Sequence, residues 1–225
     1  MTNSEVWADM DRYLQGLFVP PDEALDAALQ ASSEAGLPAI HVSPNQGKLL
    51  WILARMAQAR SILEIGTLGG YSSIWLARAL PAEGRLITLE VDPKHAAVAR
   101  ANIERAGLAG RVEVRLGRAL DILPQIAAEG SGPFDLVFLD ADKMANPEYF
   151  QWALKLTRRG SVILVDNVVR RVAADAADST DPAVQGTRRF LEQAAAEPRV
   201  SAVAVQTVGV KGYDGFAVVL VTADP

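Results

Sequence analysis

Three side chains with oxygen donors stand at the ends of two apolar runs in the second half of the chain. Asp140 closes the run Phe134–Asp140, Asp166 closes the run Ser161–Asp166, and Asn167 follows directly. If these runs are neighbouring parallel strands, the three side chains converge at one edge of a sheet. Two carboxylates and an amide carbonyl are hard ligands that suit Mg²⁺, Mn²⁺ or Ca²⁺ and leave positions for water or substrate. The pattern therefore predicts a divalent-cation site.

A lysine follows the first of these carboxylates within the segment DADK (Asp140–Lys143). Beside a divalent cation and partly desolvated, a lysine has its neutral form favoured, so Lys143 is a candidate base. The alternative is an ordinary solvated lysine, which is the usual environment of this residue type.

A second set of chemistry-bearing residues lies in GTLGGYSS (Gly66–Ser73), directly after the apolar run Ser61–Ile65. The dinucleotide fingerprint G-x-G-x-x-G fails here, because Leu68 and Tyr71 occupy its second and third glycine positions. Glu90 ends the next apolar run, where a carboxylate can accept hydrogen bonds from both hydroxyls of a ribose. Together these features predict a nucleoside cofactor without a pyrophosphate.

Apolar runs recur about every 25 residues with helix-like segments between them, which is the rhythm of βα units. Several runs are apolar at consecutive positions, as in strands covered by helices on both faces. The expected strands are Ser61–Ile65, Arg85–Glu90, Arg111–Leu116, Phe134–Asp140 and Ser161–Asp166, and the expected helices between them are Tyr71–Leu80, Pro93–Ala106, Ala119–Ala128 and Pro147–Thr157.

The two ends of the chain depart from this rhythm. Three helices are expected before the first strand, the third of them beginning at Ser43-Pro44. Asn167–Gly186 is expected to be a loop, followed by a helix over Thr187–Ala196. The closing runs SAVAVQTVGV and FAVVLV are joined by KGYDG, in which Asp214-Gly215 is a hairpin signal.

The resulting fold prediction is a single α/β domain over residues 1–225. Its core, 61–225, is a doubly wound, Rossmann-like, seven-stranded and mostly parallel sheet with a terminal antiparallel hairpin and helices on both faces. Residues 1–58 are expected to form N-terminal helices that cap the cofactor and substrate side.

Composition excludes several classes of protein. The chain has no cysteine and two histidines, His41 and His95, which excludes disulfide frameworks, thiolate metal sites and histidine-rich metal sites. The net charge of −5 argues against a nucleic-acid partner. No apolar run approaches the length of a membrane span, and the first residues do not resemble a signal peptide, so we expect a cytoplasmic protein.

The segments LEIGTLGGYSS, ITLEVDP, FDLVFLDADK, VILVDNVVR and VGVKGYDGFAV occur in this order. They resemble the cation-dependent class I O-methyltransferases, a family that includes catechol and caffeoyl-CoA O-methyltransferases, and the resemblance covers roughly residues 35 to 222. It implies S-adenosylmethionine as methyl donor, a catechol-like phenolic small molecule as acceptor, a Mg²⁺-type cation, and a homodimer formed through the terminal hairpin.

The resemblance also implies a role for each matching residue. Lys143 and Asp140 are the catalytic residues, with Lys143 as the base. The cofactor-binding residues are Val42, Glu64, Gly66, Thr67, Ser72, Glu90, Ala119 and Asp140, and the metal ligands are Asp140, Asp166 and Asn167. Asn45 departs from the pattern, because many relatives carry an acid at this position.

Three other functions are compatible with the same fold. A nicotinamide-dependent oxidoreductase is disfavoured by Leu68 and Tyr71 in the glycine-rich loop. A metal-independent methyltransferase of RNA or protein is disfavoured by the negative charge and by the two acids and amide at the strand ends. A non-catalytic binding module is disfavoured only by the presence of all three candidate metal ligands.

Overall fold

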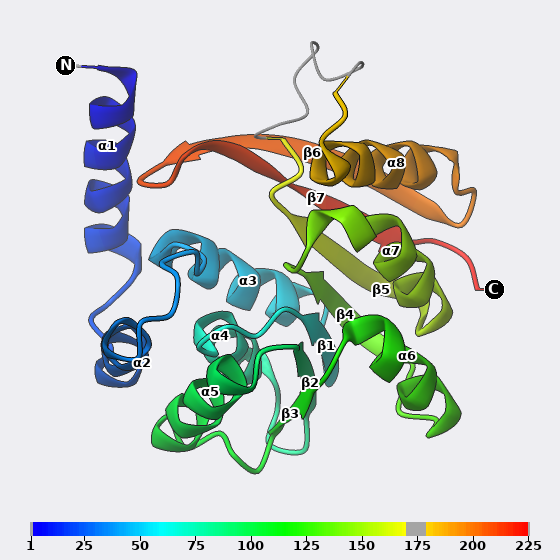
Figure 1. Ribbon diagram of the computed structural model, residues 1–225, viewed down its shortest axis with the longest axis horizontal. Coiled ribbons are helices and arrows are strands. Elements are labelled where there is room, and N and C mark those ends of the chain that lie inside the picture. Colours follow the sequence, from blue (N-terminus) through cyan, green and yellow to red (C-terminus); the bar gives the residue numbers. More distant parts are fainter. Residues whose placement is uncertain (1, 170–178, 225) are drawn as a thin grey trace.

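A twisted seven-stranded sheet runs through the computed structural model, which describes residues 2–169 and 179–224 (Figure 1). The strand order is β3-β2-β1-β4-β5-β7-β6. Strands β1 to β5 pair in parallel, and β7 lies antiparallel between β5 and β6. The strands are β1 (Ser61–Ile65), β2 (Arg85–Glu90), β3 (Val112–Leu116), β4 (Phe134–Leu139), β5 (Thr157–Asp166), β6 (Val200–Gly209) and β7 (Gly212–Val221). The doubly wound prediction is therefore confirmed.

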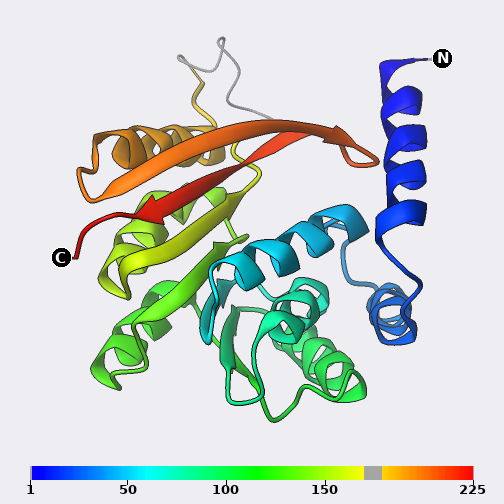
Figure 2. The ribbon, with the colours of Figure 1, turned by 180° about the vertical axis from the view of Figure 1, so that it is seen from behind.

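Helices cover both faces of the sheet (Figures 1 and 2). The helical elements are α1 (Asn3–Phe18), α2 (Glu23–Glu34), α3 (Pro44–Met56), α4 (Tyr71–Ala79), α5 (Pro93–Arg105), α6 (Ala119–Ala128), the 3-10 turn η1 (Lys143–Ala145), α7 (Asn146–Lys155) and α8 (Pro182–Ala196). None of the helices within the described residues is long and apolar enough to cross a membrane.

Neighbouring residues of one strand point into two different cores, one on each face of the sheet. In β1, Leu63 and Ile65 pack with α6, α7 and α8, where Phe150 and Phe190 meet edge to face. Ile62 instead packs with α2 to α5 on the opposite face. Because both faces are buried, the strand is apolar at consecutive positions, as its sequence indicates.

The terminal hairpin turns at a different place from the one predicted. Its turn is formed by Val210 and Lys211, and Asp214 lies inside β7, opposite Thr207 of β6. The prediction of a turn at Asp214-Gly215 is therefore wrong. Gly212, with φ +86°, supplies the left-handed backbone at the true turn.

The predicted loop over Asn167–Gly186 is too long. Helix α8 begins at Pro182, because the Asp181 side chain accepts a hydrogen bond from the Ala183 amide at 2.8 Å and proline is favourable at the first helical position. The rest of the predicted loop lies partly outside the described residues.

Candidate active site

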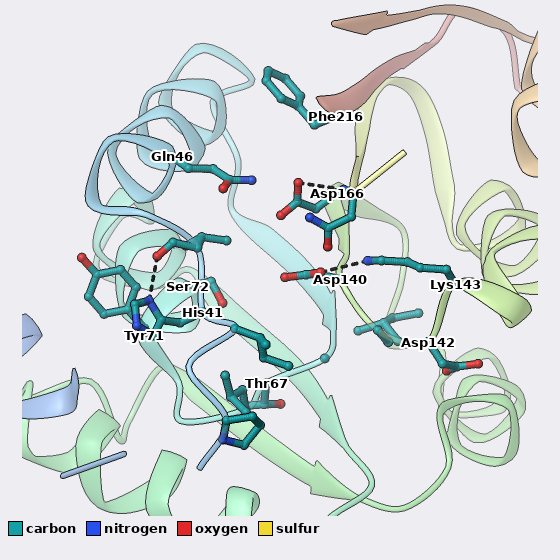
Figure 3. A pocket seen from close by; sticks show the side chains of 18 of the residues that line it. His41, Gln46, Thr67, Tyr71, Ser72, Asp140, Asp142, Lys143, Asp166 and Phe216 are labelled. Atoms are coloured by element: carbon teal, nitrogen blue, oxygen red, sulfur yellow. Dashed lines mark hydrogen bonds and ion pairs between the residues drawn. The ribbon is translucent and has the colours of Figure 1, made fainter. Parts of the chain in front are cut away.

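A large cavity of about 1630 Å³ opens beyond the carboxyl ends of the parallel strands. This is the position where ligands bind in open α/β sheets, beside the point between β1 and β4 where the strand order reverses. Residues from both ends of the chain line its wall, including Asp11 on α1 and Phe216 on β7. Figure 3 shows side chains from several strand ends pointing into this one space.

The glycine-rich loop after β1 lies against the end of β4. Gly66 has φ +101°, and a Cβ at this position would come within 2.1 Å of the Asp140 carbonyl oxygen. The Asp140 amide also donates to the carbonyl of Ile65 at 2.9 Å. Only glycine fits so close an approach, so the loop predicted to hold the cofactor and the first predicted metal ligand are fixed to one another.

Glu90, at the end of β2, lines the cavity and is 7% exposed. Its carboxylate accepts hydrogen bonds from the backbone amides of Leu68, at 2.8 Å, and of Val91 and Asp92, both at 2.9 Å. Glu90 therefore holds the shape of the glycine-rich loop from the neighbouring strand. His95, whose Nδ1 lies 3.7 Å from the Glu90 carboxylate, lines the same part of the cavity.

Glu64 is fully buried behind the cavity wall. Its carboxylate accepts hydrogen bonds from the hydroxyl groups of Ser72, at 2.6 Å, and Ser73. Burial raises the pKa of Glu64 to about 7, although the serine hydroxyls act in the opposite direction. Because Ser72 lines the cavity, Glu64 holds one hydroxyl group of the cavity wall from behind.

The remaining predicted cofactor residues also lie in the cavity wall. Val42 precedes α3 and Ala119 begins α6. Thr67 follows Gly66, and its hydroxyl is hydrogen-bonded to that of Thr88 at 2.6 Å. The structure thus brings together, around one space, all the predicted cofactor residues except the buried Glu64.

Asp140 and Asp166 face the same space at the ends of the adjacent strands β4 and β5 (Figure 3). Burial and, after it, the nearby Asp140 carboxylate raise the pKa of Asp166 to about 6, while Lys143 acts in the opposite direction. The Lys143 ammonium lies 3.0 Å from the Asp140 carboxylate. The prediction that these side chains converge is confirmed, and their excess negative charge suits a cation.

Asn167 adds an amide to the two carboxylates. Its backbone is left-handed, with φ +57°, and its backbone N–H donates to the Asp166 carboxylate at 2.8 Å. The side-chain nitrogen of Asn167 donates to the Asp214 carboxylate at 3.0 Å, so the side-chain oxygen of Asn167 points away from Asp214. Within residues 2–169 and 179–224, no three His, Asp or Glu side chains are grouped to hold a metal.

Gln46 is a site residue that the sequence analysis missed. It lies in the first turn of α3, and its side chain points toward the Asp166 carboxylate, where it acts to lower the pKa of that carboxyl (Figure 3). In the sequence, Ser43 followed three residues later by Gln46 is the pattern of a capping box, in which the glutamine would turn back to the helix start. Only one of the two capping-box hydrogen bonds forms, in which the Ser43 hydroxyl accepts from the backbone N–H of Gln46 at 3.2 Å.

Asp11 joins three elements at the outer wall of the cavity. It accepts a hydrogen bond from the side chain of Asn45 on α3 and, at 2.9 Å, from the amide of Val210 in the hairpin turn. This contact explains the departure at Asn45, because an acid at that position would repel Asp11 whereas an amide donates to it. The next residue of the turn, Lys211, donates to the carbonyl of His41.

Comparisons with known proteins agree on one family. A model of the O-methyltransferase family matches residues 21–220. The catechol O-methyltransferase of Niastella koreensis is 56% identical over 219 residues, which cover 97% of this chain and 99% of that protein. The structure of an O-methyltransferase from Bacillus cereus in complex with SAH is 57% identical and covers 97% of this chain and 99% of that one, with a TM-score of 0.94. TomG from Streptomyces achromogenes, an O-methyltransferase involved in tomaymycin synthesis and solved in complex with SAM, is 54% identical and covers 99% of this chain and 100% of that one, with a TM-score of 0.95.

The raised pKa of Glu64 predicts a pH dependence of folding stability. Because the native pKa is about 7 and the ordinary value is 4.5, the native state holds this proton between these pH values and the unfolded state does not. Stability contributed by Glu64 is therefore lost as pH rises through this window, by on the order of 3 kcal/mol. The free energy of unfolding is measured with urea at pH 5 and at pH 8. Between these pH values it is expected to fall less for Glu64→Gln than for the parent protein. The exposed Glu104→Gln serves as control, and identical pH dependence in parent and Glu64→Gln would refute the assignment.

Proposed function

The chain belongs to the O-methyltransferase family, and from this premise we propose that it transfers the methyl group of S-adenosylmethionine to one hydroxyl of a catechol-like small molecule with the help of a divalent cation. The observation that carries the proposal is the convergence of Asp140, Asp166 and Asn167 beside the glycine-rich loop. The SAM and SAH complexes of similar enzymes support the methyl donor, and the name of the Niastella koreensis relative supports the acceptor.

The donor half of the cavity fits a nucleoside with an amino-acid chain. Gly66 and Thr67 offer a surface without bulky side chains, and Glu90 stands where a ribose diol can donate to it. Ser72, which donates to Glu64, would hold the methionine part, and Val42, just before α3, and Ala119, at the start of α6, would border the cofactor. When bound, S-adenosylmethionine supplies an electrophilic methyl group on a positively charged sulfur.

The cation half fits a hard ion such as Mg²⁺, Mn²⁺ or Ca²⁺, because all three candidate ligands present oxygen. Asp140, Asp166 and Asn167 would hold it. When bound, such an ion would supply positive charge that favours the ionised phenol of the acceptor as nucleophile. The buried position of Asp166 excludes water from one side of the site.

Lys143 is placed to take the proton that the acceptor hydroxyl loses. In the reaction a bond forms between that oxygen and the methyl carbon as the carbon–sulfur bond breaks, which leaves S-adenosylhomocysteine and one proton. The Lys143 ammonium is largely buried and lies 3.0 Å from Asp140, beside the cation ligands. As the base, the Lys143 side chain would accept the proton, and the Asp140 carboxylate would stabilise the ammonium that results.

We also propose that the chain acts as a homodimer of one-domain subunits. Helix α1 buries none of its residues, and it exposes large apolar side chains, namely Val6, Met10, Tyr13, Leu14, Leu17 and Phe18. Strand β6 is the edge of the sheet and exposes Val203 and Val205. An apolar edge strand beside an apolar helix favours association of two copies. The cytoplasmic location and the absence of a nucleic-acid partner stay predictions.

Removal of divalent ions is expected to abolish methylation. With labelled S-adenosylmethionine and a panel of catechols, mass spectrometry should detect product with Mg²⁺ and none after EDTA, because the vicinal oxygens are then no longer held. The matching monophenols serve as control acceptors and should give little product. Equal turnover of a catechol with and without EDTA would contradict the proposal.

Replacement of Lys143 separates its role as a base from its role as a charge. Lys143→Arg keeps a cation near Asp140 but cannot lose its proton at neutral pH. We expect it to lower kcat by roughly 10²- to 10⁴-fold, the usual contribution of a general base, with S-adenosylmethionine affinity unchanged. Lys155→Arg, on the exposed face of α7, is the control. If Lys143→Arg retained full kcat, Lys143 would not be the base.

The homodimer proposal predicts a mass of twice the 24.1 kDa of one chain in light scattering after gel filtration. Val203→Glu places a charge on the exposed edge strand and should yield a monomer. Met56→Glu, at the exposed end of α3, is the matched control and should remain a dimer. A monomeric parent protein at micromolar concentration would refute this proposal.

A further inference from the structure

Asp214 is a nearly buried carboxylate to which neither the sequence analysis nor the proposed reaction assigns a role. It lies in β7, is 8% exposed and forms part of the cavity wall. Burial of a charged group is costly unless other groups hydrogen-bond to it. Its contacts therefore indicate what this carboxylate does in the structure.

Both oxygens of Asp214 accept hydrogen bonds. One accepts from the backbone amide of Gly215 at 2.9 Å, and the other accepts from the side-chain nitrogen of Asn167 at 3.0 Å. The second contact spans the gap between β7 and the end of β5, from a residue 47 positions away in the sequence. Asp214 thus contacts the only amide among the three proposed cation ligands.

The backbone around this contact is held on both sides. Asp166 pairs with Phe216 in the β5–β7 ladder, and the Val168 amide donates to the Gly215 carbonyl at 3.0 Å. Asn167 lies between these two attachments in its left-handed conformation. A Cβ on Gly215 would come within 2.4 Å of the Val205 carbonyl oxygen, so only glycine fits where β7 packs this closely on β6. The distance between Asn167 and Asp214 is therefore set by the sheet.

The chemistry of the pair fixes which end of the Asn167 amide faces Asp214. The amide has an NH₂ group that only donates and an oxygen that only accepts. A carboxylate offers acceptors alone, so the NH₂ group must face Asp214 and the oxygen must face away from it. Only the oxygen can ligate a hard cation.

We propose that Asp214 is a positioning residue that selects the orientation of the Asn167 amide in which the oxygen serves as a cation ligand. The inference rests on the proposed function, because it assigns Asp214 a task within that cation site. Outer residues of this kind commonly change metal affinity by roughly 10- to 100-fold when they are replaced.

A double-mutant cycle tests the inference on the full chain with Mn²⁺ alone, and free Mn²⁺ is measured by electron paramagnetic resonance. Asp214→Asn is expected to weaken Mn²⁺ binding by roughly 10- to 100-fold. In the Asn167→Ala background there is no amide to orient, so Asp214→Asn should have no further effect there. A loss of the same factor in both backgrounds would mean that Asp214 acts by charge or by general structure, and would overturn the proposal.

Exchange of the two side chains gives a second test. In the variant with Asn167→Asp and Asp214→Asn together, the amide at 214 donates to the carboxylate at 167 and leaves one carboxylate oxygen for the cation. Mn²⁺ affinity should therefore recover most of the loss seen with Asp214→Asn alone. No recovery in a variant whose thermal midpoint matches the parent would overturn the inference. If the parent protein itself does not bind Mn²⁺, the proposed cation site fails, which is a different result from failure of the Asp214 assignment.

Discussion

Two carboxylates held side by side at the buried ends of adjacent strands are the constraint on which the site depends. The Asp140 carboxylate raises the cost of ionising the buried Asp166, and the fold places donors around the two side chains to offset that cost. Lys143 pairs with Asp140, the Gln46 side chain points toward Asp166, and the backbone N–H of Asn167 donates to Asp166. The remaining negative charge is what makes the position attractive to a hard cation.

The proposed donor and cation halves of the cavity are coupled by backbone contact. Gly66 packs on the Asp140 carbonyl without room for a side chain, and Glu90 holds the intervening loop through the amide of Leu68. This close packing fixes the position of one half relative to the other. Methyl transfer requires such a fixed position, because sulfur, methyl carbon and oxygen must lie in a straight line. The family match decides against a nicotinamide-dependent oxidoreductase, the function that the failed dinucleotide fingerprint already disfavoured.

The sequence predicts those parts of the fold and site that local patterns determine. The first two strands are found at their predicted bounds, and the oxygen donors of β4 and β5 meet because parallel strands end at a common edge. Contacts between distant segments have no local signal, so Gln46 was not predicted at the Asp166 carboxylate. Asp214-Gly215 was misread as a turn because the pair serves tertiary contacts, with Asn167 and with the backbone of β6.

The most direct test of the central claim is the nuclear relaxation of ¹³C-methyl-labelled S-adenosylmethionine bound to the protein, with Mn²⁺ and then Mg²⁺ as the cation. If Asp140, Asp166 and Asn167 hold the ion beside the methyl donor, Mn²⁺ will strongly enhance relaxation of the bound methyl carbon, and Asp166→Ala will abolish the enhancement. Bound donor whose methyl carbon relaxes equally with Mn²⁺ and with Mg²⁺ would contradict the account.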